Sequence, residues 1–173
     1  MHIIIGLLGI VVAAYFWMMR VRNAAEMAKT LAEVPGDIKA AARRFGFKRK
    51  LNAHAVDSVE DPKVAIAGIA NSFIEMDTLP TQEQRQMLKL QVQSALDVSS
   101  DDAEELLVLG RWLANESGGP EAGIYRLSIR LHKIDASDGF RTLMGLLKNL
   151  LKDDWSEGQI EALGDVKRAF RIA

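Results

Sequence analysis

The sequence predicts an all-α protein in which a single N-terminal transmembrane helix precedes a bundle of about six or seven helices. Three observations support this fold class. Residues 3–19 contain no charged residue, which is typical of a membrane-spanning helix. In the rest of the chain apolar residues recur at intervals of three and four, the spacing of one helix face. No stretch of the sequence has the pattern of a convincing strand.

The apolar segment, IIIGLLGIVVAAYFWMM, occupies 17 positions. As a helix it covers about 25 Å of a bilayer core of about 30 Å; the alternative is a buried core helix. A cleaved signal peptide is disfavoured, because no positive region precedes the segment and bulky residues follow it. Tyr15, Phe16 and Trp17 suit a membrane interface, and Arg20 and Arg22 follow directly. The positive-inside rule then predicts a bacterial inner-membrane protein with its N-terminus outside and its body in the cytoplasm.

The charges divide unevenly along the chain. Lysine and arginine number 22 against 23 acidic residues, yet residues 20–50 alone carry a net charge of +6, so the remainder carries −7. The chain contains no cysteine, which excludes disulfides, zinc sites built on thiolates and cysteine nucleophiles. We therefore expect residues 1–22 as an anchor, residues 23–60 as basic juxtamembrane helices with a linker, and residues 61–173 as one helical domain.

A short amphipathic helix is predicted after Pro35-Gly36, with cations on the face opposite its apolar residues. Beside a membrane, exposed cations favour contact with anionic lipid headgroups. Two alternatives remain: a solvated charged face, or contact with RNA or the ribosome, which the acidic body and the scarcity of interleaved aromatic residues disfavour. We define the basic collar as the candidate headgroup contacts Arg20, Arg22, Lys39, Arg43, Arg44, Lys48, Arg49 and Lys50.

Capping and breaker residues delimit the helices of the body. Asp61-Pro62 begins the first, and Thr81-x-x-Gln84 and Ser156-x-x-Gln159 are capping boxes. Residues 52–60 lack periodicity and are interpreted as a linker. In the last helix, the expected buried positions are Ile160, Leu163, Val166 and Phe170. We predict helices beginning near Pro62, Thr81, Ser99 or Ser100, Glu121, Phe140 and Ser156.

Two segments share one pattern: an apolar helix, an acidic turn, a cap of the Ser/Thr-x-x-Gln type and another apolar helix. This pattern, and the text IANSFIEMDTLPTQEQRQMLKLQVQSALDVSSDDAEELLVLGRWLANE, resembles the TerB-like (tellurite-resistance B) family over about residues 61–170. The resemblance implies a pseudo-symmetric helical bundle. A membrane-tethered domain of this kind also looks like the front half of membrane-anchored DnaJ-like co-chaperones, but no J domain and no HPD motif follow here.

The TerB-like resemblance also implies a role for the acidic turns, because in that family they are implicated in divalent-metal binding. Thr78 and Trp155 stand where the family usually has glycine, and Pro80 stiffens the first turn. Ca²⁺ takes about six to eight oxygen ligands that converge within about 2.6 Å, whereas the carboxylates here lie on two separate turns. The alternative is that the acidic residues stabilise helix N-termini. No cofactor is expected other than Ca²⁺ or Mg²⁺, and the candidate metal ligands are Asp77, Glu83, Asp153, Asp154 and Glu157.

Material for an enzyme active site is scarce. The chain has no glycine-rich dinucleotide motif, no phosphate-binding loop, no nucleophile elbow and no His-Glu-x-x-His motif. His2, His54 and His132 share no motif and are interpreted as solvated or capping residues. Trp112 is either at the edge of the core or an exposed anchor for a partner. The candidate partner-binding residues are Arg111, Trp112, Arg126 and Arg130.

Three functional hypotheses follow. In the first, a membrane-tethered helical domain binds other membrane or cytoplasmic proteins as a scaffold, in envelope or metal stress. In the second, the chain is an accessory subunit of a larger inner-membrane complex, such as a respiratory or transport complex. In the third, the two acidic turns sense a divalent cation. An enzyme and a nucleic-acid partner are not expected, and the oligomeric state and the identity of the partner stay open.

Overall fold

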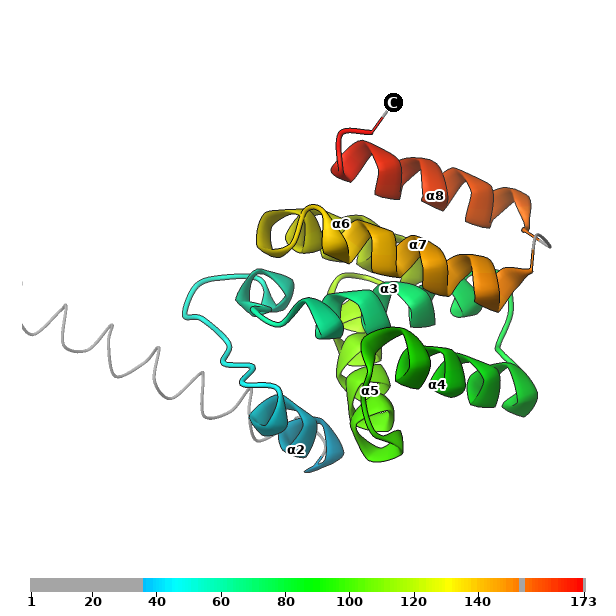
Figure 1. The fold of residues 1–173 in the computed structure, drawn as a ribbon. Coiled ribbons are helices and arrows are strands. Elements are labelled where there is room, and N and C mark those ends of the chain that lie inside the picture. The colour runs from blue at the N-terminus through cyan, green and yellow to red at the C-terminus, as the bar shows by residue number, and fades with distance from the viewer. Residues whose placement is uncertain (1–35, 153–154, 173) are drawn as a thin grey trace, which may run out of the picture. The chain divides into compact units, whose positions relative to one another are not determined.

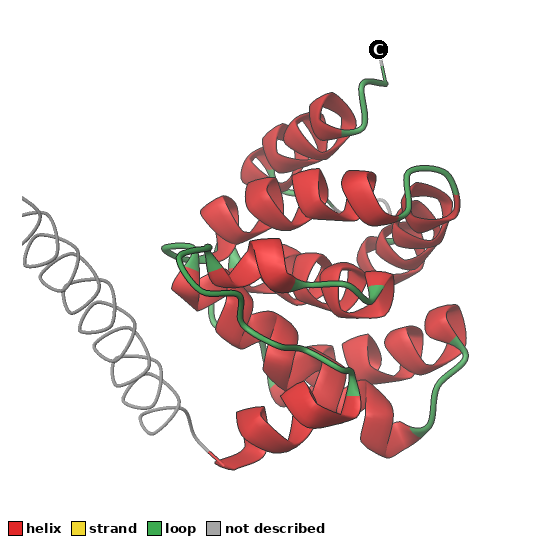
Figure 2. Ribbon diagram, turned by 90° about the vertical axis from the view of Figure 1, so that its left-hand side faces the viewer, coloured by secondary structure: helices red, strands yellow, loops and turns green. Residues whose placement is uncertain are grey.

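The computed structural model describes residues 36–152 and 155–172. Within these ranges seven α-helices and one 3₁₀ helix form, and no strand is found there (Figure 1, Figure 2). The prediction of an all-α body is therefore confirmed. None of the helices in this described part combines the length and apolarity needed to cross a bilayer. The expected anchor at residues 3–19 lies outside the described residues.

The helices begin and end close to the capping signals in the sequence. Both predicted capping boxes are present, at the starts of α4 and α8. At the first helix of the predicted body, Asp61 accepts a hydrogen bond from the Lys63 amide at 2.9 Å. The elements are α2 (Gly36–Arg44), η1 (Ala55–Ser58), α3 (Pro62–Glu75), α4 (Gln82–Leu96), α5 (Ser100–Glu116), α6 (Pro120–Ile134), α7 (Asp138–Leu151) and α8 (Glu157–Ala169).

Helix α3 is the centre of the bundle. Its ten consecutive residues from Val64 to Phe73 are all buried, because α4, α5, α6 and α7 all contact it. Figure 1 shows α5 crossing it on one side and α6 and α7 lying along the other. A helix that is apolar on every side is stable in water only inside such a core. Burial of each large apolar side chain contributes about 1.5–3 kcal/mol, so α3 supplies much of the stabilising burial.

A close approach of two backbones fixes the crossing of α3 and α5. A Cβ atom added at Gly110 of α5 would lie 2.5 Å from the Gly68 Cα atom and 2.6 Å from the Gly68 amide nitrogen. Only glycine fits at such a distance. Gly110 is buried within α5, and the crossing depends on the absence of side chains at both residues.

Helix α8 packs on α6, and of the four positions expected to be buried, Val166 and Phe170 are buried and Leu163 is half-buried. The prediction that Ile160 is buried is wrong, because its exposed fraction is 58%, whereas the preceding Gln159 is only 8% exposed. Gln159 accepts the Ser156 amide hydrogen bond and donates through Nε2 to the Phe73 carbonyl oxygen at 2.8 Å. This bond satisfies an acceptor in the last turn of α3 and turns Gln159 toward the core.

Residues 47–60, which include the predicted linker, pack against the bundle. Val56 and Val59 are 2% and 1% exposed, and η1 contacts α5 and α6. His54 caps η1, as expected for a capping histidine, and its Nε2 lies 3.1 Å from the Glu116 carbonyl oxygen. The described residues from 36 onward accordingly form one compact unit.

Candidate functional site

A polar pocket of about 330 Å³ lies where α3, α4 and α5 meet. The volume is at the lower end of the range for small-ligand sites. Polar and charged side chains come from all three helices, and apolar atoms make up the larger share of the pocket surface. The pocket is lined by Asn71, Glu75, Gln82, Arg85, Gln86, Leu88, Lys89, Glu104, Leu107, Val108 and Arg111.

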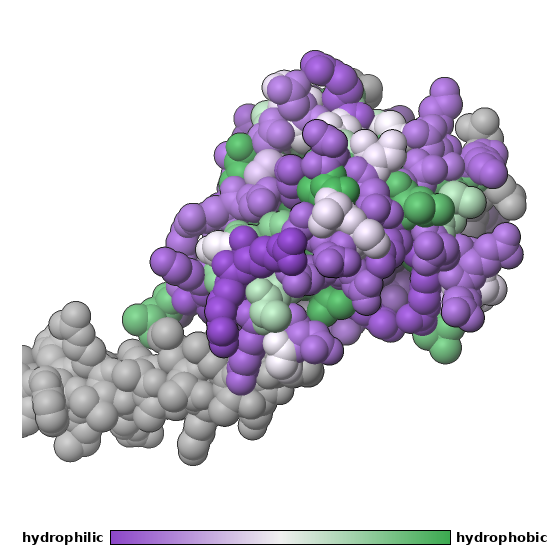
Figure 3. Space-filling view, turned by 60° about the horizontal axis from the view of Figure 1, so that its bottom comes forward, coloured by the Kyte–Doolittle hydropathy of each residue, from purple (hydrophilic) through white to green (hydrophobic). Residues whose placement is uncertain are grey.

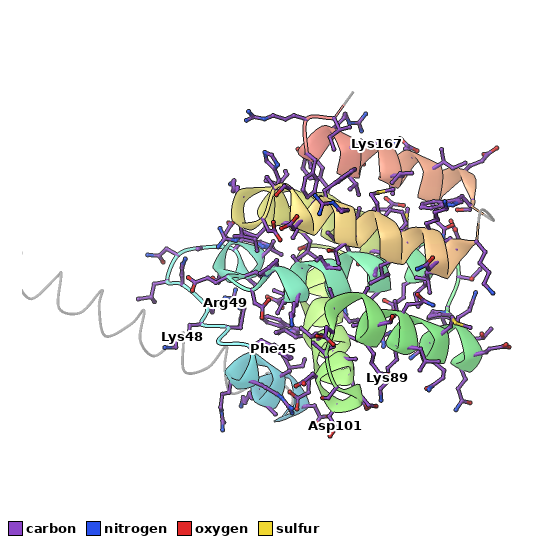
Figure 4. The ribbon with its side chains drawn as sticks, viewed as in Figure 1. Phe45, Lys48, Arg49, Lys89, Asp101 and Lys167 are labelled. Atoms are coloured by element: carbon purple, nitrogen blue, oxygen red, sulfur yellow. The ribbon has the colours of Figure 1, made fainter. Side chains whose placement is uncertain are left out.

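Two ion pairs cross the wall of the pocket. Arg111 Nε of α5 lies 3.0 Å from Glu75 Oε1 of α3, and Lys89 Nζ of α4 lies 2.7 Å from Glu104 Oε2 of α5. The hydrogen bond from Lys89, with the attraction of its charge, lowers the pKa of Glu104. Both carboxylates are therefore occupied by cations, and the pairs join the three helices around the pocket. Figure 4 labels Lys89 on α4.

Two hydrogen-bond donors in the pocket are not occupied in this way. Arg85 uses Nε to donate to the Pro80 carbonyl oxygen at 3.3 Å, which leaves its two terminal nitrogens without a partner among the described residues. Asn71 is only 7% exposed, and its Nδ2 has no hydrogen-bond partner within the described part of the chain. A buried donor without a partner is destabilising. The lining of the pocket therefore includes one exposed and one buried donor without a partner among the described residues.

The lining consists of carboxylate, amide, cationic and apolar side chains. Among the described residues that line the pocket there is no serine, threonine, cysteine or histidine to act as a nucleophile. Sequence reasoning predicted a role for Arg111 but did not find the pocket. The available signals were the polar pair Asn71-Ser72 within an otherwise apolar helix, and Arg85 and Lys89 four residues apart on one helix face.

The structure places one predicted metal ligand beside the start of α8. Asp77 Oδ1 would lie 3.2 Å from a Cβ atom added at Gly158, so the turn after α3 adjoins the first turn of α8. A carboxylate in this position stabilises a helix N-terminus. Glu83 and Glu157 are exposed in the first turns of α4 and α8. Asp153 and Asp154 lie outside the described residues. Among those described, no three histidine or acidic side chains gather as a metal site would require.

Several cations of the basic collar hold the collar to the domain. Arg44 contacts Asp102 at 2.5 Å and Glu105 at 3.3 Å, both on α5. A hydrogen bond from Ser99, opposed by desolvation and assisted by Arg44, lowers the pKa of Asp102. Arg49 lies 3.4 Å from Glu116 and Lys50 lies 3.1 Å from Glu60. These pairs dock α2 and the following loop on the bundle.

The remaining described collar residues are the candidates for headgroup contact. Arg43 and Lys48 are exposed, and Lys39 is half-buried. Figure 4 shows Lys48 and Arg49 in the loop that follows α2. In Figure 3, the face bearing α2, α4 and α5 is mostly hydrophilic, with hydrophobic residues in small groups. Arg20 and Arg22 lie outside the described residues.

Changing Arg43 and Lys48 together to glutamine is expected to weaken the binding of residues 20–173 to anionic vesicles about thirtyfold. The reason is that each cation near anionic lipid contributes about 1 kcal/mol. Vesicle sedimentation at fixed ionic strength measures this binding. Arg126→Gln is the control, because Arg126 is an exposed cation on α6 outside the collar. Unchanged binding of the double variant would show that these cations serve another purpose.

The four candidate partner-binding residues take different positions. Arg111 lines the polar pocket, and Trp112 packs edge-on against Phe47 with ring centroids 5.8 Å apart. Trp112 is half-buried, at the edge of the core. Arg130 donates from Nε to the Val59 carbonyl oxygen at 2.5 Å and so holds the loop before α3. Arg126 is exposed.

His132 is not the solvated residue that its place in the sequence predicted. Its ring packs edge-on against Phe170 with centroids 5.3 Å apart, and the side chain is half-buried.

Comparison of the chain with models of protein families, with curated protein sequences and with solved structures finds no match.

Proposed function

We propose that this chain is a single-pass protein of the bacterial inner membrane that presents a cytoplasmic TerB-like helical domain as a protein-interaction module, in envelope or metal stress. The apolar segment 3–19 would be the anchor, and the positive residues after it set the orientation. The observed all-helical bundle, with its paired capping boxes, supports the TerB-like assignment.

The polar pocket is the observation that carries the binding role. The core of the domain is packed with apolar side chains, yet one pocket is lined by the buried Asn71 amide and the exposed Arg85, and both keep donors without a partner among the described residues. A partner that supplied acceptors there would gain hydrogen bonds without displacing existing ones. Because both pocket carboxylates are ion-paired, the lining supports recognition more than general base catalysis.

The test is recovery of a partner from native membranes with a tagged full-length chain in mild detergent. The variant Gln86→Trp places a bulky side chain in the pocket, since Gln86 lines it and is exposed. We expect the wild-type chain, recovered from the membrane fraction, to bring down a partner that Gln86→Trp loses. Lys167→Trp, on an exposed position of α8, is the control and should retain it.

The outcomes separate the proposal from its alternative. Co-migration with a stoichiometric complex that survives Gln86→Trp would favour an accessory subunit held by its anchor. Recovery of the mature chain without its first twenty or so residues would overturn the membrane-bound scaffold altogether. A partner lost equally from both tryptophan variants would remove the pocket from the proposal.

A divalent-cation sensor is the second candidate, favoured by the position of Asp77 beside the first turn of α8. Trp155, in the second turn, packs edge-on against Phe73 with centroids 6.0 Å apart. If Asp77 and the acidic residues of the second turn bind Ca²⁺, we expect Trp155 emission to change before the Ca²⁺ concentration exceeds about 1 mM. Fluorescence of the full-length chain measures this response.

The controls for the Ca²⁺ titration are Asp77→Asn, which should abolish the change, and Trp155→Phe, which identifies the emitting residue. An Mg²⁺ titration at the same concentrations tests selectivity, because Mg²⁺ demands a tighter octahedral site. No change in emission at millimolar Ca²⁺ would exclude the sensor.

A further inference from the structure

The charges of the polar pocket leave one cation unneutralised. Its lining carries three cations, Arg85, Lys89 and Arg111, and two carboxylates, Glu75 and Glu104. Lys89 and Arg111 each pair with one of those carboxylates. Arg85 makes only a hydrogen bond from Nε to a backbone carbonyl oxygen among the described residues. The planar guanidinium group, with both terminal nitrogens available, matches the geometry of a carboxylate.

The single positive charge limits the class of anion. A monoanion neutralises the pocket, whereas a phosphate dianion would bring an extra negative charge near Glu75 and Glu104. Asn71 provides a second donor for the same ligand, since its Nδ2 is buried without a partner in the described part of the chain. Asn71 and Arg85 therefore both belong to the lining of this one pocket.

Apolar side chains complete the lining beside these donors. Leu88 is already out of water at 1% exposed, so the accessible apolar surface comes from Leu107 and Val108, which are half-buried. A ligand that carries an apolar group next to its carboxylate would cover this surface and remove it from water. The volume of about 330 Å³ suits a small group, such as a short-chain acid or the last residue of a polypeptide.

We propose that the polar pocket binds a single carboxylate that bears an adjoining apolar group, with Arg85 and Asn71 donating to its oxygens. This inference rests on the proposed binding function and names what the pocket recognises. The carboxylate comes either from a free monocarboxylic acid or from the C-terminus of a partner polypeptide, and the probes below distinguish these sources.

The experiment measures binding to the full-length chain in detergent micelles by isothermal titration calorimetry, with the Asn71 side-chain amide followed by NMR. The probes are acetyl-glycyl-leucine, the same dipeptide with a C-terminal amide, 4-methylpentanoate and inorganic phosphate. We expect the free dipeptide or 4-methylpentanoate to bind and shift the Asn71 amide resonance. The amidated dipeptide and phosphate should bind at least about tenfold more weakly. Tighter binding of the free dipeptide than of 4-methylpentanoate identifies a polypeptide C-terminus, and the reverse order identifies a free acid.

Two variants test the assigned donors. Arg85→Gln removes the charge at an exposed position and should weaken acid binding about tenfold. The matched control Lys167→Gln, an exposed cation on α8 outside the pocket (Figure 4), should leave binding unchanged. Asn71→Leu should weaken binding while raising the thermal midpoint, because it removes an unpartnered buried amide. A purely structural role for Asn71 would give a lower midpoint with unchanged binding.

Several results would overturn the carboxylate proposal: equal binding of the acid and the amide, tighter binding of phosphate, or full acid binding by Arg85→Gln. Should Asn71→Leu fail to fold, the exposed Arg85 variant still decides the question. A partner that Gln86→Trp loses but Arg85→Gln retains would leave the interaction function intact while refuting carboxylate recognition. If neither the wild-type chain nor Gln86→Trp recovers a partner while carboxylate binding is intact, the carboxylate proposal stands and the interaction function is refuted.

Discussion

Gly110→Ala is expected to lower the free energy of unfolding by more than about 3 kcal/mol, a large part of the stability of a typical domain. The added methyl group would lie 2.5 Å from the Gly68 Cα atom and 3.2 Å from the Ala67 carbonyl carbon. These atoms belong to the backbone of α3, so no side-chain rotation relieves the overlap. The two helices would have to separate where the core is most fully buried.

Urea unfolding of the full-length chain, followed by circular dichroism, measures the effect. Gly145→Ala is the matched control, since a Cβ atom there has nothing within 4 Å and the residue lies within α7. Alanine is the better helix former, so we expect this variant to be as stable as the wild type or about 0.5–1 kcal/mol more stable. Equal stability of the two variants would mean that α3 and α5 do not approach so closely.

Phe73→Ala should cost about 3–5 kcal/mol. Phe73 is completely buried at the C-terminal end of α3, where its ring packs against Trp155 and its carbonyl oxygen accepts the hydrogen bond from Gln159. Truncation would leave a cavity that the surrounding helices fill only in part. Because Trp155 loses its ring partner, its emission should also shift to longer wavelength as water reaches it.

Chemical denaturation gives the stability of Phe73→Ala, and the emission spectrum of the folded variant reports on Trp155. Tyr125→Ala provides the comparison, since Tyr125 is an aromatic residue of α6 that is 50% exposed. Its effect should stay within about 0.5 kcal/mol. A small loss for Phe73→Ala together with an unchanged Trp155 spectrum would refute the described packing of this end of the domain.

The positions of the helices were largely predictable because their ends are specified locally. Asp61 with Pro62, and the boxes that begin at Thr81 and Ser156, satisfy backbone amides within a few residues of themselves. Such signals depend on little beyond neighbouring residues. Leu106 and Leu147 lie on the apolar face that helix periodicity defines in their segments, and both are fully buried.

The remaining features depend on contacts between residues far apart in sequence. Gln159 is buried because an acceptor 86 positions earlier, on Phe73, lies beside it. The segment around Val56 has no periodicity, and only the surfaces of α5 and α6 bury it. The pocket likewise requires α3, α4 and α5 to meet, so Asn71 and Arg85 could not be connected by their spacing alone.

The position of α3 also bears on how the chain is made. This helix leaves the ribosome before α5 and α6, the two helices that contact it most extensively. Until α6 has been synthesised, its apolar surface has no complete set of native neighbours in the nascent polypeptide. Exposed surface of this kind promotes aggregation and chaperone capture. The order of the helices along the chain therefore leaves the apolar surface of α3 uncovered by its native neighbours during synthesis, until α5 and α6 have emerged and packed against it.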